Sequence, residues 1–256
     1  NLPDISQLPQ LLTPRSRILA LGQMSNGTGG CPNLEQAIAI AHEAGMVVMV
    51  DGAQGVVHFP ADVQRLDIDF YAFSGHKLYG PTGIGVLYGK SHLLDAMSPW
   101  LGGGKMITEV TFDGFQTQPV PYKLEAGTPN VAGVIGLGAA LEWLNGVDIA
   151  QAESYSRGLA TLAEDALAKR AGFRSFRSQD SRLLAFDFEG VHHSDMVTLL
   201  AGYGIALRAG QHCAQPLLAA LGVKGTLRAS FAPYNTQHDV DALVDAVDRA
   251  LNLLVD

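Results

Sequence analysis

The chain has 256 residues, of which 47% are hydrophobic and 16% charged, and it carries a formal net charge of −8. This length allows one large domain or two modest ones, and the acidic balance argues against a nucleic-acid-binding surface, which needs clustered Lys and Arg. The two cysteines, Cys31 and Cys213, form no CxxC pair, which argues against a structural zinc site or a disulfide scaffold and favours a reducing, cytoplasmic location.

Strands and helices are predicted to alternate through the first half of the chain. Short apolar runs predict strands over 17–21, 46–50, 69–73 and 83–89, and helical periodicity predicts helices over 33–45 and 91–97. Asn33 with Gln36 three residues later is typical of a helix N-cap, and Gly45 of a helix end. The fourth strand follows the third after a short Gly/Pro loop, a spacing that allows antiparallel pairing. The alternation favours a mostly parallel sheet covered by helices.

The second half has a different character. Residues 100–129 are rich in Gly and Pro and show no period, so we expect an ordered loop region that joins two lobes. The patterns beyond it predict helices over 131–145, 149–170, 193–204 and 237–255, and strands over 182–188, 205–210 and 227–232. Ser194 is a candidate cap of the third of these helices. We therefore expect an α+β second half, no apolar run long enough for a membrane span, and no signal peptide at the start.

Polar side chains follow two of the predicted strands directly. The strand over 46–50 runs into Asp51 and Gln54, and the strand over 69–73 runs into Ser74, His76 and Lys77. Ligands of open α/β sheets bind at the carboxyl ends of the strands, so these side chains would converge if the strands are neighbours. Pyridoxal phosphate needs a lysine, a carboxylate for its ring nitrogen and donors for its phosphate. Such a lysine, partly desolvated beside a cationic ring, would have a lowered pKa and act as nucleophile and base.

Simpler interpretations compete with this one. An aspartate after a strand is most often a turn former, and a His-Lys pair in a Gly/Pro loop is most often solvated. A phosphate-binding P-loop is poorly supported, because the chain contains no GxxxxGK[ST] pattern. The combination of two strand ends and several residue types favours the pyridoxal phosphate site.

Five segments together resemble one known family. They are "VDGAQ", "DIDFYAFSGHKLYGPTGIGVLYGK", "LEAGTPN", "RAGQHCAQP" and "LRASFAPYN". They resemble group II cysteine desulfurases and selenocysteine lyases, which are class V aminotransferase-like enzymes of the fold-type I pyridoxal phosphate group. The resemblance runs from about Arg17 to the C-terminus. It implies an α/β fold with a mostly parallel large domain, here residues 1–118, and an α+β small domain, here residues 119–256, that carries the cysteine loop.

The resemblance also implies roles in cofactor binding. Lys77 resembles the Schiff-base lysine and Asp51 the partner of the ring nitrogen. Gln54 matches the residue that hydrogen-bonds the phenolic oxygen. The remaining matches are phosphate ligands, namely Ser74, His76 and Thr128. The last of these matches a threonine that reaches the cofactor of the other subunit, which implies a homodimer.

Further roles concern the substrate and the sulfur. Asn26 and Arg228 match residues that hold the substrate carboxylate, and Cys213 matches the nucleophile that takes the sulfur. His212 before it would be a nearby acid or base. The implied activity is release of sulfur, selenium or sulfite from L-cysteine, L-selenocysteine or L-cysteine sulfinate, with L-alanine as product and a Cys213 persulfide that passes to a small acceptor protein of the SufE-like type. Fe–S cluster assembly or another sulfur-transfer pathway would use it.

The chain departs from the family pattern in two places. The family's cysteine loop commonly has two histidines, whereas Gln211 replaces the first here. The family also has more than a hundred residues upstream, with the ring that stacks on the cofactor and a helix that binds its phosphate. We therefore expect the chain to correspond to the C-terminal two-thirds of the fold, and to bind cofactor weakly or not at all without the remainder.

Alternatives remain for the individual residues and for the function. Cys213 would be a buried hydrophobe if it were unreactive, and Arg228 would form a salt bridge at the edge of a core. We interpret Cys31 as structural or incidental, and His192–His193 as a solvated loop rather than a metal site. A class V transaminase or epimerase would keep Lys77 and Asp51 without needing Cys213, and a non-catalytic scaffold would tolerate the loss of Lys77.

Overall fold

The computed structural model describes residues 2–178 and 181–255 and divides into two compact units. The first unit contains Asp4–Gln23 and Asn33–Gly146, and the second contains residues 2–3, Met24–Pro32 and the chain from Val147 onwards. This division differs from the predicted one, since residues 119–146 group with the first unit and Met24–Pro32 with the second. The chain between residues 100 and 129 therefore belongs to the first unit and is not the junction between lobes.

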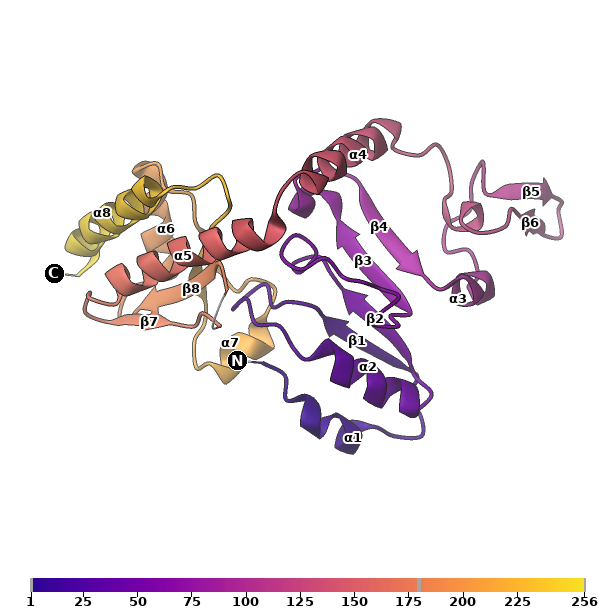
Figure 1. Cartoon of the computed structure of the whole chain (residues 1–256), viewed down its shortest axis with the longest axis horizontal. Helices are drawn as coiled ribbons and strands as arrows, with labels where there is room; N and C mark the ends of the chain where they lie inside the picture. Colours follow the sequence, from indigo (N-terminus) through magenta and orange to yellow (C-terminus); the bar gives the residue numbers. More distant parts are fainter. Residues whose placement is uncertain (1, 179–180, 256) are drawn as a thin grey trace. The chain divides into compact units, whose positions relative to one another are not determined.

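A four-stranded sheet forms the centre of the first unit (Figure 1). Its order is β1-β2-β3-β4, with β1 at Ile18–Gly22, β2 at Val47–Asp51, β3 at Phe70–Ser74 and β4 at Gly85–Gly89. The first three strands are parallel, and β4 pairs antiparallel with β3. The four strands predicted from the sequence are confirmed, and so is the antiparallel return of the last one.

Helix α2 (Leu34–Glu43) connects β1 to β2 and covers the sheet. Asn33 caps it by accepting a hydrogen bond from the Gln36 amide at 3.1 Å, and Gly45 ends it with a φ of +69°, a conformation that glycine adopts without strain. Its apolar face packs on the strands in a buried core of Ile38, Ala41, Met46, Val48, Val50, Ile68 and Tyr71. Burial of this face fixes the register of β2 and thereby the position of the residues that follow it.

The rest of the first unit is less regular. It holds η1 (Ile5–Gln7), α1 (Leu8–Leu11), η2 (Gly75–Leu78), α3 (Ser91–Ala96), β5 (Ile107–Val110), β6 (Phe115–Thr117), η3 (Tyr122–Leu124) and α4 (Val131–Asn145). The predicted helices over 91–97 and 131–145 are confirmed. The β5–β6 hairpin contradicts the expectation of a loop without strands. Its turn contains Asp113–Gly114, and an Asp-Gly pair between short alternating runs is a hairpin signal.

The second unit is an antiparallel sheet with helices. The strand order is β7-β8-β10-β9, with β7 at Phe173–Ser175, β8 at Leu183–Phe188, β10 at Thr226–Ser230 and β9 at Arg208–Gly210. The helices are α5 (Ile149–Leu167), α6 (His193–Gly202), α7 (Gln215–Ala220) and α8 (Gln237–Leu254). Apolar faces of α5, α6 and α8 form one core with β8 and β10. The predicted α+β character is confirmed.

One detail of the second unit differs from prediction, and a second describes the environment of β8. Helix α6 is capped by His192, whose ring accepts a hydrogen bond from the Ser194 amide, so Ser194 is not the cap. All six residues of β8 are buried, because the strand lies between β7 and β10 with the helical core against it. No helix in the described part of the chain is long and apolar enough to cross a membrane.

A buried carboxylate ties three parts of the first unit together. Asp69 precedes β3 and accepts hydrogen bonds from the Val48 amide at 2.7 Å and from Nε2 of His42 at 2.9 Å, and it pairs with Nζ of Lys90 at 2.7 Å. Burial acts to raise the pKa of Asp69, but the hydrogen bonds from Lys90, Val48 and His42 outweigh it, and the pKa lies below its ordinary value. The folded state is therefore stabilised by the ionised form of this residue.

We expect Asp69→Ala to reduce the free energy of unfolding by about 2–4 kcal/mol at neutral pH, because it leaves buried donors without a partner. Since the folded pKa is depressed, this contribution is complete above the unfolded value of about 3.9 and is lost as the pH falls below it. Denaturant unfolding of both proteins between neutral and acid pH measures this difference. Asp67→Ala is the control, because Asp67 contacts His42 and Lys90 with its side chain 65% exposed and should contribute less than about 1 kcal/mol. Equal losses in the two variants would contradict the assignment.

Candidate functional site

The carboxyl ends of β2 and β3 lie side by side, as the sequence predicts. Asp51 is in register with Ala72, and the amide of Gly52 donates to the Ala72 carbonyl oxygen at 2.8 Å. Ser74 lies two residues beyond Ala72 at the end of β3. The structure thus brings the Asp51–Gln54 and Ser74–Lys77 segments to one edge of the sheet, where α/β proteins bind ligands.

Asp51 is held by local bonds while its side chain stays exposed. Its Oδ1 accepts from the Ala53 amide at 2.8 Å, and its carbonyl oxygen accepts from the Gln23 amide at 2.9 Å. Gln23 in turn accepts a hydrogen bond from the Tyr71 hydroxyl at 2.6 Å. A Cβ on Gly52 would lie 2.1 Å from the Tyr71 ring, so only glycine fits there. Burial, with a smaller effect of the Asp51 charge, raises the pKa of Tyr71 to about 12, which keeps its hydroxyl a donor at neutral pH.

The Ser74–Lys77 segment turns away from the sheet at once. Oγ of Ser74 lies 2.9 Å from Nδ1 of His76, and η2 carries His76 and Lys77 with both side chains exposed. Tyr79 ends the turn with a φ of +61°. An amine, an imidazole and a hydroxyl therefore share the edge of the sheet with the Asp51 carboxylate. Gln54 is also predicted to belong to this site, and its Nε2 lies 3.4 Å from Nε2 of His58.

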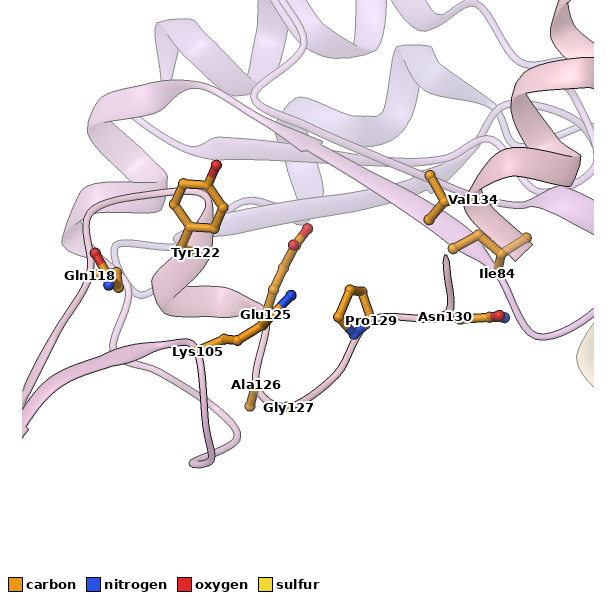
Figure 2. A pocket seen from close by; sticks show the side chains of 10 residues that line it. All are labelled: Ile84, Lys105, Gln118, Tyr122, Glu125, Ala126, Gly127, Pro129, Asn130 and Val134. Carbon is orange, nitrogen blue, oxygen red and sulfur yellow. The ribbon is translucent and has the colours of Figure 1, made fainter. Parts of the chain in front are cut away.

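Thr128 lies in a loop beside a cavity of the first unit. The cavity has a volume of about 520 Å³ and is lined by Ile84, Lys105, Gln118, Tyr122, Glu125, Ala126, Gly127, Pro129, Asn130 and Val134 (Figure 2). Asn130 fixes the loop, since its Oδ1 caps α4 through the Gly133 amide and its Nδ2 donates to the Gly83 carbonyl oxygen, both at 3.0 Å. Thr128 itself is exposed.

The cysteine loop belongs to the second unit. It follows β9 and contains two consecutive residues with left-handed backbone, His212 with a φ of 51° and Cys213 with a φ of 55°. The His212 side chain is buried, whereas Cys213 is exposed as a free thiol. Burial, and next the positive charge of Arg228, lowers the pKa of His212, so the ring is neutral at physiological pH. Cys213 is therefore not the buried hydrophobe of the alternative interpretation.

The two residues predicted to hold a substrate carboxylate, Asn26 and Arg228, are neighbours in the second unit. Nη1 of Arg228 donates to the backbone oxygen of Asn26 at 2.6 Å, and Nδ2 of Asn26 donates to the backbone oxygen of His212 at 2.6 Å. Nε of Arg228 is buried and has no hydrogen-bond partner within the described residues. Burial, with the nearby charge of Arg208, lowers the pKa of Arg228. A guanidinium with an unused buried donor suits an anionic ligand.

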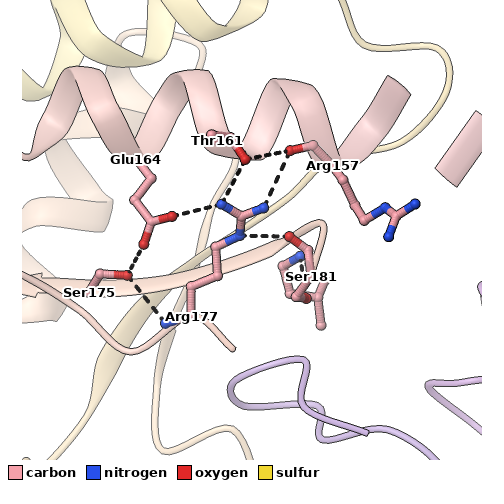
Figure 3. Close-up of polar contacts among 7 residues, drawn as sticks. Arg157, Thr161, Glu164, Ser175, Arg177 and Ser181 are labelled. Carbon is pink, nitrogen blue, oxygen red and sulfur yellow. Dashed lines mark hydrogen bonds and ion pairs between the residues drawn. The ribbon is translucent and has the colours of Figure 1, made fainter. Parts of the chain in front are cut away.

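The Met24–Pro32 segment is anchored to the loop that precedes β8. The Ser178 amide donates to the Thr28 carbonyl oxygen at 2.9 Å, and the neighbouring Arg177 has a buried guanidinium. Arg177 donates to the Ser181 carbonyl oxygen at 2.7 Å, to Oγ1 of Thr161 at 3.0 Å and to Glu164 at 2.7 Å (Figure 3). The segment that contains Asn26 is therefore hydrogen-bonded to a residue whose neighbour, Arg177, bonds to α5.

Two other sequence features are Cys31 and the His192–His193 pair. Cys31 lies in the Met24–Pro32 segment and is exposed overall, but its thiol is partly shielded from water by neighbouring atoms. This partial burial, with the charge of Glu153, raises the pKa of the thiol and disfavours the reactive thiolate. His192 and His193 stack with ring centroids 4.4 Å apart. Among residues 2–178 and 181–255, no group of three or more His, Cys, Asp or Glu side chains is arranged to hold a metal ion.

The chain belongs to the class V aminotransferase family, because the sequence model of that family matches residues 1–243. It is 84% identical over all 256 residues to the cysteine desulfurase CsdA of Escherichia coli, and it spans 64% of that protein's length. A crystal structure of that E. coli enzyme in an S-sulfonic acid form superposes with a TM-score of 0.97, covering 99% of this chain and 64% of the other. A cysteine desulfurase of Thermococcus onnurineus in its apo form gives a TM-score of 0.91 at 32% identity, covering 98% of this chain and 64% of the other. The α/β fold expected from the resemblance is thus confirmed.

Sequence reasoning missed the residues that support the site. Tyr71 and Gln23 fix the backbone of Asp51, and Thr226 contacts the ring of His212. The alternation of β3 could have placed Tyr71 on a buried face. No local pattern connects Thr226 with His212, because the two meet only through the pairing of β9 with β10.

Proposed function

We propose that the full-length protein is a pyridoxal phosphate-dependent cysteine desulfurase. The observation that carries the proposal is the meeting of an exposed carboxylate and an exposed lysine at the adjacent carboxyl ends of β2 and β3, in a chain of the class V family. The identity to an E. coli cysteine desulfurase supports the choice within the family. A transaminase or epimerase would need no reactive cysteine, yet the second unit exposes Cys213 on a strained loop.

The residues of the first unit fit this cofactor. Pyridoxal phosphate, when bound, supplies a sink for the electron pair left at the substrate's Cα. Lys77 would anchor the cofactor's aldehyde carbon and later remove the proton from the substrate's Cα, and Asp51 would hold a proton on the ring nitrogen. Ser74 and His76 would donate hydrogen bonds to the phosphate, and Gln54 to the phenolic oxygen. Thr128 would reach the phosphate in a second copy, and we accordingly propose a homodimer.

The residues of the second unit would handle the substrate's carboxylate and its sulfur. Arg228 and Asn26 would hold the carboxylate of L-cysteine. The Cys213 thiolate would attack the substrate sulfur, so that an S–S bond forms while the Cβ–S bond breaks and its electron pair takes up a proton at Cβ. Alanine leaves and a persulfide remains on Cys213. We propose a small SufE-like protein as the acceptor and a reducing, cytoplasmic setting.

Product analysis of the full-length protein tests the proposal. With pyridoxal phosphate, L-cysteine and a thiol reductant, we expect L-alanine and sulfide in equal amounts. A transaminase would give a keto acid, an epimerase would give D-cysteine, and a scaffold would give neither product. Any of these three outcomes, in a protein that has bound the cofactor, would overturn the proposal.

A further inference from the structure

His212 is held at two points by residues far from it in the sequence. Its carbonyl oxygen accepts a hydrogen bond from Nδ2 of Asn26 at 2.6 Å. Its Nε2 lies 3.0 Å from Oγ1 and 3.1 Å from the carbonyl oxygen of Thr226. Because a carbonyl oxygen only accepts, Nε2 carries the ring proton and donates it to Thr226. Both the main chain and the side chain of His212 are thereby fixed.

Both attachments depend on side chains from one face of β10, one directly and the other through Asn26. Thr226 and Arg228 are two residues apart on this strand, so their side chains lie on the same side of the sheet. Thr226 contacts the His212 ring directly, and Nη1 of Arg228 holds the backbone of Asn26 at 2.6 Å, which in turn holds the His212 main chain. We call this arrangement of Asn26, Thr226 and Arg228 around His212 the β10 clamp.

The clamp acts on a strained piece of backbone. His212 and Cys213 both have a positive φ, and this left-handed region of the backbone is unfavourable for residues other than glycine. Two such residues in a row persist only where their surroundings hold them. The turn is closed by the Ala214 amide, which donates to the Gln211 carbonyl oxygen at 2.9 Å. The clamp therefore contacts the first of the two strained residues directly, at both its main chain and its ring.

We propose that Asn26 and Thr226 are positioning residues that lock the left-handed His212–Cys213 turn and so aim the Cys213 thiol. The claim that the orientation of the thiol matters for activity rests on the proposed function, whereas the claim that the two residues lock the turn does not. His212 then acts through its backbone and not as a solvent-facing acid or base, which agrees with its 2% exposure. Asn26 connects Arg228 to the cysteine loop, because its carbonyl oxygen accepts from Arg228 while its side-chain amide donates to the His212 carbonyl oxygen.

Amide hydrogen exchange in the full-length protein tests the lock without substrate. In Asn26→Ala, we expect the Ala214 amide to exchange about tenfold faster, as the loss of one strong hydrogen bond shifts a local opening equilibrium. Ser25→Ala is the matched control, because Oγ of Ser25 bonds only the Gly27 and Thr28 amides of its own segment among the described contacts. Unchanged exchange in Asn26→Ala, or an equal rise in Ser25→Ala, would overturn the lock.

Thr226 gives a second, independent variant. Thr226→Val keeps the side-chain shape and the carbonyl contact but removes Oγ1, so we expect the Ala214 amide to exchange about threefold faster, and Thr226→Ser to restore the wild-type rate. In the holoenzyme, Thr226→Val should lower kcat with L-cysteine by about fivefold and leave turnover of L-cysteine sulfinate within about twofold, because the second substrate does not need the thiol.

The kinetic outcomes separate a positioning role from a structural one. An equal loss with both substrates would mean that Thr226 only supports the fold, and would overturn its positioning role. Faster exchange in Asn26→Ala and Thr226→Val, in a protein that releases no sulfur from any substrate, would uphold the lock and overturn the proposed function instead. The two proposals therefore fail by different results.

Discussion

Replacing Lys77 with alanine is expected to abolish sulfur release from L-cysteine and to remove the visible absorbance band of the bound cofactor. Lys77 follows β3 with an exposed side chain at the edge that also carries Asp51. If it both anchors the cofactor and moves the Cα proton, its loss removes a covalent bond and a general base, and a base alone contributes about 10²–10⁴-fold to rate. We therefore expect turnover to fall by about 10⁴-fold or more.

Two further variants make this test specific. Lys77→Arg keeps a positive charge but has no primary amine to bond the aldehyde, so it should lose the band and the activity as fully as Lys77→Ala. Lys169→Ala, which removes an exposed lysine just beyond α5, should change neither. An absorbance spectrum and an alanine assay on each purified full-length variant give the answer. If the band survives in Lys77→Ala, another lysine bonds the cofactor and the assignment is wrong.

The part of the site in the first unit was predictable because its information is local. Asp51 and Ser74 directly follow short apolar strands, and the Gly/Pro turn after Lys77 returns the chain as β4. Neighbouring parallel strands then bring the two segments together by the geometry of the sheet alone. The individual roles of these residues came from the family resemblance, and they stay predictions until variants are measured.

The second unit shows where such reasoning ends. The bond from Asn26 to the His212 carbonyl spans 186 residues, and the bond from Arg228 to Asn26 spans 202. No local sequence pattern predicts either bond, because each depends on the packing of Met24–Pro32 within the second unit. The chain on both sides of this segment belongs to the first unit. The left-handed pair at His212 and Cys213 was equally hidden, because no glycine or asparagine marks it. The β5–β6 hairpin is different, since its Asp-Gly turn was a usable signal.

Replacing Cys213 with alanine is expected to separate two reactions. L-cysteine has a poor leaving group, so sulfur transfer needs the Cys213 thiolate, and turnover should fall by about a hundredfold or more. Sulfite leaves L-cysteine sulfinate without help from a nucleophile, and its turnover should stay within about threefold. Alanine formation from each substrate, measured on the same preparation of full-length enzyme, gives the ratio directly.

Three features make this comparison strict. Alanine and cysteine meet the same backbone strain at a φ of 55°, so Cys213→Ala should preserve the loop, whereas glycine would relax it. Cys31→Ala controls for the loss of a thiol, because burial and the charge of Glu153 raise the pKa of Cys31 and it should have no part in either reaction. An unchanged Ala214 amide exchange rate would show that the β10 clamp is intact in the variant. Equal loss with both substrates would then mean that Cys213 serves a step common to both, and the thiol would not be the sulfur-accepting nucleophile.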